Sequence, residues 1–489
     1  MAWPPLRLAA AIGALTALRV VVAALAPLTD DEAYYRLWAL APAMSYFDHP
    51  PMTAWMIAAG MWTAGDNALG VRLAALMTSL LGPFILWRAG CILFGRTVAE
   101  RATWLALAMP LLAVGGVIIT PDTPSVLFWG LAVWAVAELH TSRNDNWWLA
   151  IGLFCGLGLL AKYTNLFVGA GIGLWVVCSP TSWRWLRSWQ LWFSVALVCL
   201  LALPVMIWNA QHEWASFARQ FGRVVSGSQS ATLRFILEFV GAYLGLASPL
   251  IAVLSAWGVW MVSRCAIRTR NPPELIVAVM ILPFMLYCLV HAVHARVQAN
   301  WPAPLYPTLA LCAAITICSI AREQVRQRLE WSALAVGFVL SGLIYAHALH
   351  PIVYGPGIGD PTSQMRGWAE LAAEVEKLQR VHGAGWIATS SYATTGQLAF
   401  QLKSGPPVIQ LNERIRYVHL PPVDDRIIHT PAIYIELERN LAIDLLKSRF
   451  ASIQNLGIAT RRYLDNALDR YVIYRVADPI DPILRHRDR

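Results

Sequence analysis

The sequence predicts a polytopic α-helical membrane protein with a small C-terminal α/β domain, and three observations lead to this fold class. The 489 residues are 57% hydrophobic and only 14% charged, whereas soluble domains carry about 25% charged residues. Long apolar runs fill residues 1–350, and residues 351–489 have ordinary soluble composition. Many of the 23 tryptophans lie beside the apolar runs, as anchors at a membrane interface do.

Eleven segments approach the roughly 20 apolar residues that a transmembrane helix needs. The predicted spans are 6–28, 68–94, 102–119, 121–140, 147–162, 164–180, 189–209, 234–262, 273–293, 301–320 and 331–350. The first is interpreted as an uncleaved span, because its apolar part is long and no clear small-residue cleavage site follows it. Around Lys162 the pattern allows two short helices that meet at one face, or one long helix with a re-entrant turn.

Arginines fall in alternate connections between the spans, which the positive-inside rule assigns to the cytoplasm. They are Arg96, Arg101, Arg143, Arg184, Arg187, Arg264, Arg268, Arg270, Arg322, Arg326 and Arg328. With eleven spans, the N-terminus is then cytoplasmic and the C-terminal domain lies on the outer face. The net charge of +9 comes with scattered arginines rather than a basic stripe with interleaved aromatics, so no nucleic-acid partner is predicted.

Two parts of the chain are expected outside the membrane. In the first outer loop, 29–67, apolar residues at helical spacing predict an amphipathic helix in the interface; they are Met52, Trp55, Met56, Ala59 and Trp62. After the transmembrane domain, 1–350, a linker of Pro351, Gly355, Pro356, Gly357 and Gly359 opens the soluble domain, 351–489. Its predicted strands are 386–390, 432–436 and 470–475, and its predicted helices are 395–403 and 441–449.

Three adjacent acids, Asp30, Asp31 and Glu32, follow the first span and precede Tyr34 and Tyr35. Acids at a membrane surface cost free energy through mutual repulsion and partial desolvation, and they usually mark function. Transfer of a group to a hydroxyl acceptor needs a carboxylate that takes the proton. A helix N-cap is the competing interpretation.

Two further acids share the predicted outer face. Asp48 and His49 precede Pro50 and Pro51, which stop a helix and fix the backbone. They are candidates for binding substrate, and a capped turn at the water surface explains them equally well. Asp122 stands at a proline-bounded turn between two spans, where an N-cap is again the alternative.

Cations in unusual places are candidates for holding an anion. Lys162 interrupts an apolar stretch, which is costly unless it meets an anion or reaches water by snorkelling. Arg296 lies on the predicted outer side, against the usual bias for cations, and arginine can bind phosphate with two hydrogen bonds. His294 and Asn300 flank Arg296; a histidine there, taken alone, is more simply a satisfied interfacial residue.

Five motifs in register resemble the bacterial family-39-type glycosyltransferases of the GT-C fold class, which is shared with protein O-mannosyltransferases and the lipid A aminoarabinose transferase. The resemblance covers roughly residues 6–350, and each motif alone is weak. The motifs are Asp31-Glu32-Ala33-Tyr34-Tyr35, Tyr46-Phe47-Asp48-His49-Pro50-Pro51, Pro121-Asp122, Gly158-Leu159-Leu160-Ala161-Lys162-Tyr163-Thr164 and Asn300-Trp301-Pro302.

The resemblance implies a role for each position. Asp31, with Glu32 beside it, would be the catalytic carboxylate, although the extra acid Asp30 leaves open which of the three is the base. Asp122 would shape the substrate pocket, and Lys162 and Arg296 would hold the phosphate of a polyprenyl-phosphate sugar donor. The remaining candidates would bind substrate: Tyr34, Tyr35, Asp48, His49, His294 and Asn300.

The implied enzyme is an inverting hexosyl or pentosyl transferase of a bacterial inner membrane, with a periplasmic C-terminal domain and a lipid A, lipopolysaccharide or other envelope glycan as acceptor. A phosphate leaving group needs cations rather than a general acid. No tightly bound cofactor is predicted; paired acids make a divalent metal conceivable, but none is predicted. The eight cysteines, all in or beside apolar runs, predict neither disulfides nor a zinc site.

Three other functions are alternatives to this glycosyltransferase interpretation. A protein O-glycosyltransferase would differ only in using serine or threonine hydroxyls as acceptors. A lipid-carrier transporter or flippase would place interrupted helices and ionisable residues at mid-membrane, whereas these acids lie toward one face. A structural membrane protein would not need so many acids and cations on one side.

Overall fold

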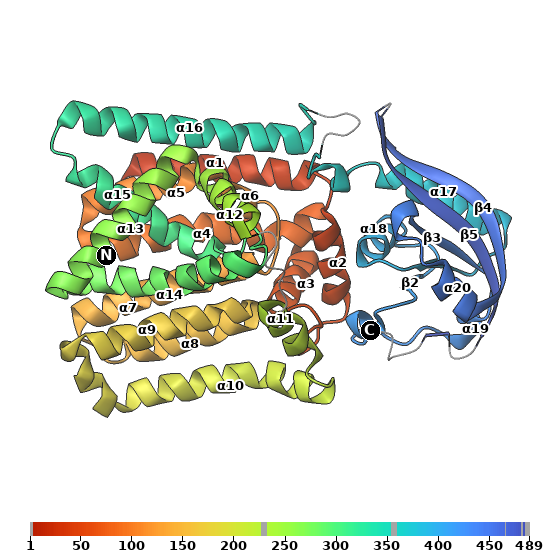
Figure 1. The fold of residues 1–489 in the computed structure, drawn as a ribbon, viewed down its shortest axis with the longest axis horizontal. Coiled ribbons are helices and arrows are strands. Elements are labelled where there is room, and N and C mark those ends of the chain that lie inside the picture. The colour runs from red at the N-terminus through yellow and green to blue at the C-terminus, as the bar shows by residue number, and fades with distance from the viewer. Residues whose placement is uncertain (1–2, 226–231, 354–358, 465, 481–482, 485–489) are drawn as a thin grey trace. The chain divides into compact units, whose positions relative to one another are not determined.

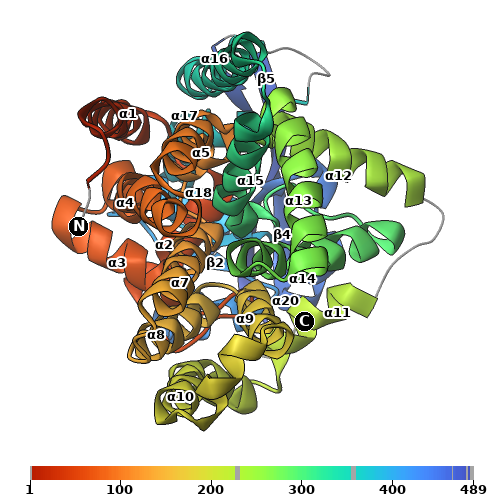
Figure 2. The same ribbon diagram turned by 90° about the vertical axis from the view of Figure 1, so that its left-hand side faces the viewer.

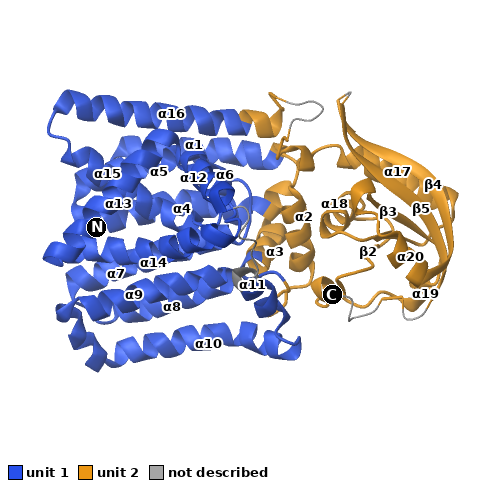
Figure 3. Ribbon diagram, in the orientation of Figure 1, with its two compact units in different colours: residues 1–24, 48–53, 72–345 blue, residues 25–47, 54–71, 346–489 orange. Residues whose placement is uncertain are grey.

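The computed structural model describes residues 3–225, 232–353, 359–464, 466–480 and 483–484. The chain divides into two compact units, one of residues 1–24, 48–53 and 72–345 and the other of residues 25–47, 54–71 and 346–489 (Figure 3). Most of the first predicted outer loop therefore groups with the C-terminal domain. The predicted linker residues Gly355, Pro356 and Gly357 lie outside the described ranges.

The first unit is helical (Figure 1). Its elements are α1 (Leu6–Leu25), α4 (Ala68–Phe94), α5 (Arg96–Ala108), α6 (Pro110–Gly115), α7 (Asp122–Ser142), α8 (Trp147–Ala161), α9 (Leu166–Cys178), α10 (Trp189–Gln211), α11 (Ala215–Val225), α12 (Thr232–Ala247), α13 (Pro249–Thr269), α14 (Pro272–His294), α15 (Tyr306–Ser319) and α16 (Glu323–Leu349). Seen along the bundle, α14 and α15 lie inside, whereas α10 and α16 lie at the periphery (Figure 2).

Among the described residues, six helices are long and apolar enough to cross a membrane: α1, α4, α10, α13, α14 and α16. The bent pair Tyr163–Cys178 and Pro180–Arg187, with an angle of 108°, makes up to seven. Of the 18-residue apolar stretch in each helix, 22% is buried in the peripheral α10 and 56% in the central α14. An apolar surface exposed in this way needs lipid around it, and the protein is a multi-pass membrane protein. Eleven spans remain a prediction.

Two predicted spans are broken in the structure. The segment 102–119 divides into α5 and α6 at Pro110, and 234–262 divides into α12 and α13 at Ser248. Proline lacks the N–H that continues a helix and clashes with the preceding turn. At the second break Ser248 also has a φ of 71°, directly before Pro249. Helix continuity was therefore wrongly predicted at both places, although each break carries a proline.

The structure resolves the alternatives left open around Lys162. Helix α8 ends at Ala161, and Lys162 is extended, with φ −158° and ψ 139°. One 3₁₀ turn, Tyr163–Asn165, then leads into α9. Two short helices therefore meet here, and the lysine occupies the extended residue between them.

The second unit contains two helices of the first predicted loop and an α/β domain. Its elements are α2 (Asp30–Leu40), α3 (Met52–Ala64), α17 (Trp368–Val381), β1 (Trp386–Thr389), α18 (Tyr392–Gln401), β2 (Val408–Gln410), α19 (Asp425–Ile428), β3 (Ala432–Leu437), α20 (Ile443–Arg449), β4 (Phe450–Tyr463) and β5 (Asn466–Pro479). A helix over 52–64 is confirmed, but it is apolar nearly all round and the predicted amphipathic pattern is wrong. Its first two residues group with the first unit, and Trp62 is 88% exposed.

The sheet has the order β2-β1-β3-β5-β4. Strand β1 runs parallel to β2 and β3, and β5 runs antiparallel to β3 and β4. Side chains alternate between two apolar layers: Ile387 and Ile433 pack with α17, and Trp386 and Tyr434 pack on the other face. The strands predicted at 386–390 and 432–436 and both helices are confirmed, and the strand predicted at 470–475 is the middle of β5.

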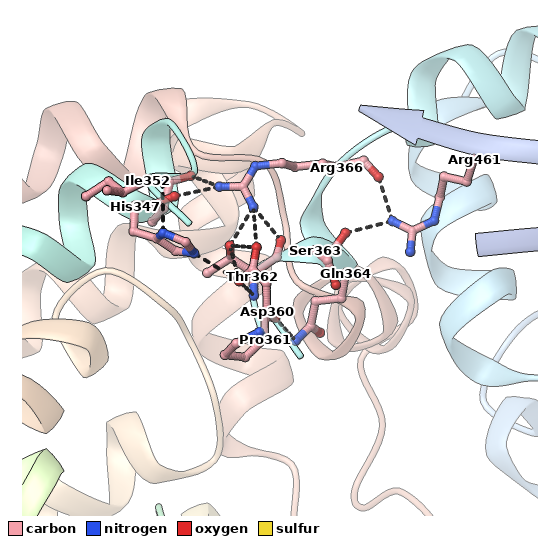
Figure 4. A network of polar contacts seen from close by, with 10 residues as sticks. His347, Ile352, Asp360, Pro361, Thr362, Ser363, Gln364, Arg366 and Arg461 are labelled. Atoms are coloured by element: carbon pink, nitrogen blue, oxygen red, sulfur yellow. Dashed lines mark hydrogen bonds and ion pairs between the residues drawn. The ribbon is translucent and has the colours of Figure 1, made fainter. Parts of the chain in front are cut away.

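Residues 346–349, the last turn of α16, belong to the second unit, and within that unit a polar network joins them to the start of the α/β domain (Figure 4). Arg366 Nη2 donates to the carbonyls of His347 and Ala348, at 2.6 and 3.1 Å, and so satisfies acceptors that the helix end leaves unpaired. The Asp360 carboxylate lies 3.0 Å from His347 Nε2 and accepts from Thr362. Burial opposes ionisation of Asp360, but the hydrogen bonds from His347 and Thr362 outweigh it and lower its pKa.

Candidate functional site

Helix α2 begins inside the acidic cluster, which we define as Asp30, Asp31 and Glu32. Thr29 is the N-cap: its hydroxyl accepts from the backbone N–H of Glu32 at 3.2 Å. Glu32 Oε2 in turn accepts from the backbone N–H of Thr29 at 3.0 Å. This capping box satisfies two N–H groups that the helix leaves unpaired. The N-cap is therefore Thr29 and none of the three acids, and Glu32 is the third residue of the capping box, with its side chain fully buried.

Asp30 is held by the C-terminal domain. Gln397 Nε2 donates to Asp30 Oδ1 at 2.9 Å and to the carbonyl of Leu28 at 3.1 Å. Burial, only partly offset by the Gln397 hydrogen bond, raises the pKa of Asp30 from 3.8 to about 6. Asp30 therefore stays partly protonated at a pH about two units higher than an ordinary aspartate does.

Asp31 contacts a different residue of the same domain. Tyr392, the first residue of α18, donates its hydroxyl to Asp31 Oδ1 at 3.3 Å. The chain thus surrounds neighbouring acids with different partners: a capping box for Glu32, an amide for Asp30 and a phenol for Asp31.

Aromatic rings surround the first turns of α2. Tyr34 lies 5.1 Å from Trp38 and 5.0 Å from Tyr392, centroid to centroid, and Tyr35 lies 4.6 Å from Trp38. The predicted substrate-binding residues Tyr34 and Tyr35 are both buried. The substrate role of these tyrosines stays a prediction.

A buried arginine completes this aromatic cluster. The guanidinium of Arg416 lies over the rings of Tyr34, Phe47 and Tyr392, at 5.7, 5.1 and 5.2 Å. Its side chain is 3% exposed and forms an ion pair with Glu413 at 2.9 Å. Cation–π contacts strengthen when the cation is desolvated, as here.

In the first unit, residues from three of the predicted motifs meet. Lys162 Nζ donates to Asp122 Oδ1 at 2.6 Å, and Asn300 Nδ2 donates to Asp122 Oδ2 at 2.5 Å. We call these three residues the lysine cluster. The side chains of Lys162 and Asp122 are 10% and 9% exposed. Asn165 Nδ2 donates to the backbone carbonyls of Gly158 and Lys162, at 2.8 and 3.4 Å.

Other predicted residues of the first unit lie in separate contacts. Asp48 Oδ1 is 3.8 Å from Arg219 Nε, and Gln220 donates to the Asp48 carbonyl. His49 neighbours Asp48 and is half-buried. The Asp48–Arg219 ion pair connects the Pro-Pro turn to α11. This pairing was not predicted from the sequence.

Arg296 pairs with an acid that the sequence analysis did not single out. Its Nε lies 2.9 Å from Glu238 Oε2, and its side chain is 71% exposed. His294 stacks edge-on against His291, with centroids 4.9 Å apart. An exposed ion pair of this kind contributes little free energy, so Arg296 can exchange Glu238 for another anion at small cost.

The residues that sequence reasoning missed come from the C-terminal domain: Tyr392, Gln397 and Arg416. Each is an ordinary residue in soluble sequence, with no motif around it. Within the described ranges, no group of three or more histidines, cysteines, aspartates or glutamates is placed to hold a metal ion.

Comparison with known proteins gives consistent results. A family model described as dolichyl-phosphate-mannose-protein mannosyltransferase matches residues 48–208. Lipid A galacturonosyltransferase RgtD of Rhizobium johnstonii is 25% identical over 76% of this chain and 77% of its own length. An undecaprenyl phosphate-alpha-4-amino-4-deoxy-L-arabinose arabinosyl transferase of Pseudomonas aeruginosa is 28% identical over 35% of this chain and 27% of its own length.

Solved structures show the same architecture. ArnT of Cupriavidus metallidurans bound to undecaprenyl phosphate superposes with a TM-score of 0.66 at 13% identity, over 95% of this chain and 97% of that one. The oligosaccharyltransferase AglB of Archaeoglobus fulgidus gives a TM-score of 0.51 at 10% identity, over 87% and 69% of the two chains. The predicted GT-C fold class is confirmed.

Proposed function

Starting from a chain that is a membrane glycosyltransferase of the GT-C fold, we propose that it transfers a sugar from a polyprenyl-phosphate carrier to lipid A or another envelope glycan. The observation that carries the proposal is the likeness over 95% of the chain to an enzyme bound to undecaprenyl phosphate. The relative that matches over most of its length is named for lipid A. The proposed acceptor follows from that relative.

For the donor, we assign the carrier phosphate to the lysine cluster. An ammonium has three N–H donors, and the hydrogen bond to Asp122 uses one. Asp122 and Asn300 fix the position of the ammonium without a rearrangement when the phosphate arrives. Arg296 is the second proposed phosphate ligand, released from Glu238. As the carrier phosphate leaves, these cations stabilise its growing negative charge.

We assign Asp31 as the general base that accepts the proton of the acceptor hydroxyl. Glu32 is committed to the capping box, and Asp30 accepts from Gln397. The Asp31 carboxylate takes the proton of the acceptor hydroxyl, whose oxygen attacks the anomeric carbon as the bond to phosphate breaks. A single displacement inverts the configuration at that carbon. The proposed step uses no cofactor, so we expect activity to persist in EDTA.

The proposed orientation places the N-terminus in the cytoplasm and the C-terminal domain in the periplasm of a bacterial inner membrane. The arginines of alternate connections support it. Reporter fusions at both ends test it: an alkaline phosphatase fused after the C-terminal domain should be active, because that enzyme folds only outside the cytoplasm. A fully expressed but inactive fusion would contradict the proposed orientation.

The central test is mass spectrometry of envelope lipids from cells with the wild-type chain, a deletion and Asp31→Asn. The deletion and Asp31→Asn should both lose a sugar-sized mass from lipid A or another glycan, while the charged carrier accumulates. Glu374→Gln, an exposed acid on α17, is the matched control and should keep the modification. Full modification in normally expressed Asp31→Asn would remove Asp31 as the base.

One alternative has an observation of its own. The matching family model is described as a protein mannosyltransferase, so serine or threonine hydroxyls are a second candidate acceptor. The same cells decide between them. If the deletion changes no lipid or glycan but removes sugars from periplasmic proteins, the acceptor is protein.

A further inference from the structure

Helix α18 of the C-terminal domain makes an unusually close approach to α2. A Cβ added at Gly396 would lie 2.8 Å from the backbone nitrogen of Tyr34 and 3.0 Å from the carbonyl carbon of Ala33. Only glycine allows the two backbones to come this near. The same helix carries Tyr392 and Gln397, which contact Asp31 and Asp30. One face of α18 therefore reaches two of the three acids of the acidic cluster.

The ring of Tyr392 also contacts Arg416. The guanidinium lies 5.2 Å from the Tyr392 centroid and 5.7 Å from that of Tyr34. A planar cation packed against both rings restricts their rotation, and Glu413 pairs with its charge. The phenol that reaches Asp31 therefore has few orientations to choose from.

The start of α18 is itself fixed by a buried carboxylate. Glu436, at the end of β3, accepts from the backbone N–H of Ser390 and from the hydroxyls of Ser391 and Thr394, each at 2.9 Å. Ser391 is the N-cap of α18. Since Tyr392 is the next residue, the sheet sets the position of its phenol.

We propose that Tyr392 is a positioning residue of the transfer reaction, which holds the Asp31 carboxylate in place and stabilises its ionised form through the phenol hydrogen bond. The C-terminal domain is then part of the catalytic apparatus. The inference rests on the proposed function, because it takes Asp31 as the base.

The chemistry makes the sign of the effect definite. A hydrogen bond donated to a carboxylate favours its charged form, so its loss raises the pKa of that carboxyl group. Other charged or titratable groups of the second unit lie around the acidic cluster. Asp30 and Glu32 flank Asp31 on α2, Arg461 and Asp469 act electrostatically on Asp30, and Arg416 lies over the Tyr392 ring. These groups are unchanged in Tyr392→Phe, which removes only the hydroxyl and keeps the ring beneath Arg416.

The test measures transfer rate against pH for the full chain in proteoliposomes, with the undecaprenyl-phosphate sugar identified by the envelope measurement as donor. For Tyr392→Phe we expect kcat to fall about tenfold, the loss of one hydrogen bond to a charged group. The acidic limb of the profile should move about one unit to higher pH, and KM for the donor should not change. Tyr474→Phe, in the same domain, is the matched control.

A second variant reverses the sign. Incorporation of 3,5-difluorotyrosine at position 392 makes the phenol more acidic and a stronger donor, so the acidic limb should move to lower pH. It also keeps the size of the side chain if Tyr392→Phe does not accumulate. An unchanged limb in both proteins, or a change in KM alone, would overturn the inference.

The outcomes separate this inference from the proposed function. If Asp31→Asn keeps its activity, Asp31 is not the base and the assignment of the acid fails, whatever Tyr392 does. If Asp31→Asn is inactive while both Tyr392 variants keep the wild-type profile, the function stands and only the positioning role is lost.

Discussion

Lys162 Nζ lies 2.6 Å from Asp122 Oδ1, although the two residues are 40 positions apart and come from different predicted motifs. Both side chains are about nine-tenths buried. Opposite charges attract far more strongly here than at a wet surface, but each has lost its hydration. Neither residue is therefore stable in this place without the other or another counter-charge.

We predict that Lys162→Met lowers the free energy of unfolding by about 3–5 kcal/mol, because it leaves the Asp122 charge buried and unpaired. The double variant Lys162→Met with Asp122→Asn should recover most of that loss. Thermal unfolding in detergent, followed by tryptophan fluorescence, measures both. Both proteins should lack transfer activity, since the donor phosphate loses its ligand.

The control for this pair is Arg234→Met, which breaks an ion pair to Glu238 in which Arg234 is 76% exposed. It should leave the unfolding temperature close to the wild-type value, because solvent screens an exposed ion pair. Equal losses in Lys162→Met and Arg234→Met would mean that Lys162 is solvated in the folded protein and not held by Asp122.

Gly396 provides a prediction about backbone packing. Gly396→Ala should destabilise the second unit by about 1–3 kcal/mol, because the new methyl group meets backbone atoms of α2 that cannot move aside. Alanine favours helices by about 1 kcal/mol over glycine, so a helix free of this contact would be stabilised instead. Thermal unfolding gives the sign.

The matched control is Gly359→Ala, where an added Cβ meets nothing within 4 Å. Its unfolding temperature should stay at the wild-type value. A stabilised Gly396→Ala protein would show that α18 and α2 are not in contact in solution, and would also remove the basis for the role of Tyr392.

The sequence predicted one part of the site better than the other. Asp122, Lys162 and Asn300 stood out because polar residues are costly next to apolar spans, and all three belong to the lysine cluster. Tyr392 and Arg416 lie in soluble sequence, where a tyrosine and an arginine are ordinary, and only the fold brings them to α2. Their contacts depend on long-range packing that has no local pattern.

The secondary structure shows the same division. Strands β1 and β3 were predicted because their runs of buried apolar residues are continuous. The edge strand β4 was missed, since one of its sides faces solvent and its sequence mixes polar and apolar residues without clean alternation. The break at Pro249 had a local signal, which the apolar composition on both sides outweighed.

Asp30 gives a prediction about pH. Its pKa is about 6 in the folded protein and 3.8 ordinarily, chiefly through burial. The folded state therefore binds the carboxyl proton of Asp30 more tightly than the unfolded state does. The stability that this protonation contributes is lost as pH rises from about 4 to 6, and it does not return at higher pH. Asp30→Asn should raise the unfolding temperature at pH 8 and leave it unchanged near pH 4.

The comparison for Asp30→Asn is Glu374→Gln, an exposed acid that should show no pH-dependent difference from wild type. The asparagine still accepts from Gln397, so the substitution tests the charge and not the hydrogen bond. A gain in stability of equal size at both pH values would contradict the raised pKa.

Glu436 supplies the last prediction, because five donors converge on its two carboxylate oxygens. Oε2 accepts from the N–H and hydroxyl of Ser390, and Oε1 accepts from Ser391, Thr394 and the N–H of Leu437. In Glu436→Gln, one oxygen becomes an NH₂ group, which must then face a backbone N–H in either orientation. Two donors cannot satisfy each other, so we expect a loss of about 2–3 kcal/mol.

Glu438→Gln is the matched control two residues further along. That carboxylate pairs with Arg470 at 3.2 Å and is 45% exposed, so its loss should cost less than about 1 kcal/mol. Unfolding of the full chain measures both. Because Glu436 fixes the residue before Tyr392, transfer activity should fall with Glu436→Gln and not with Glu438→Gln. Equal stability of the two variants would mean that water already satisfies the donors around Glu436.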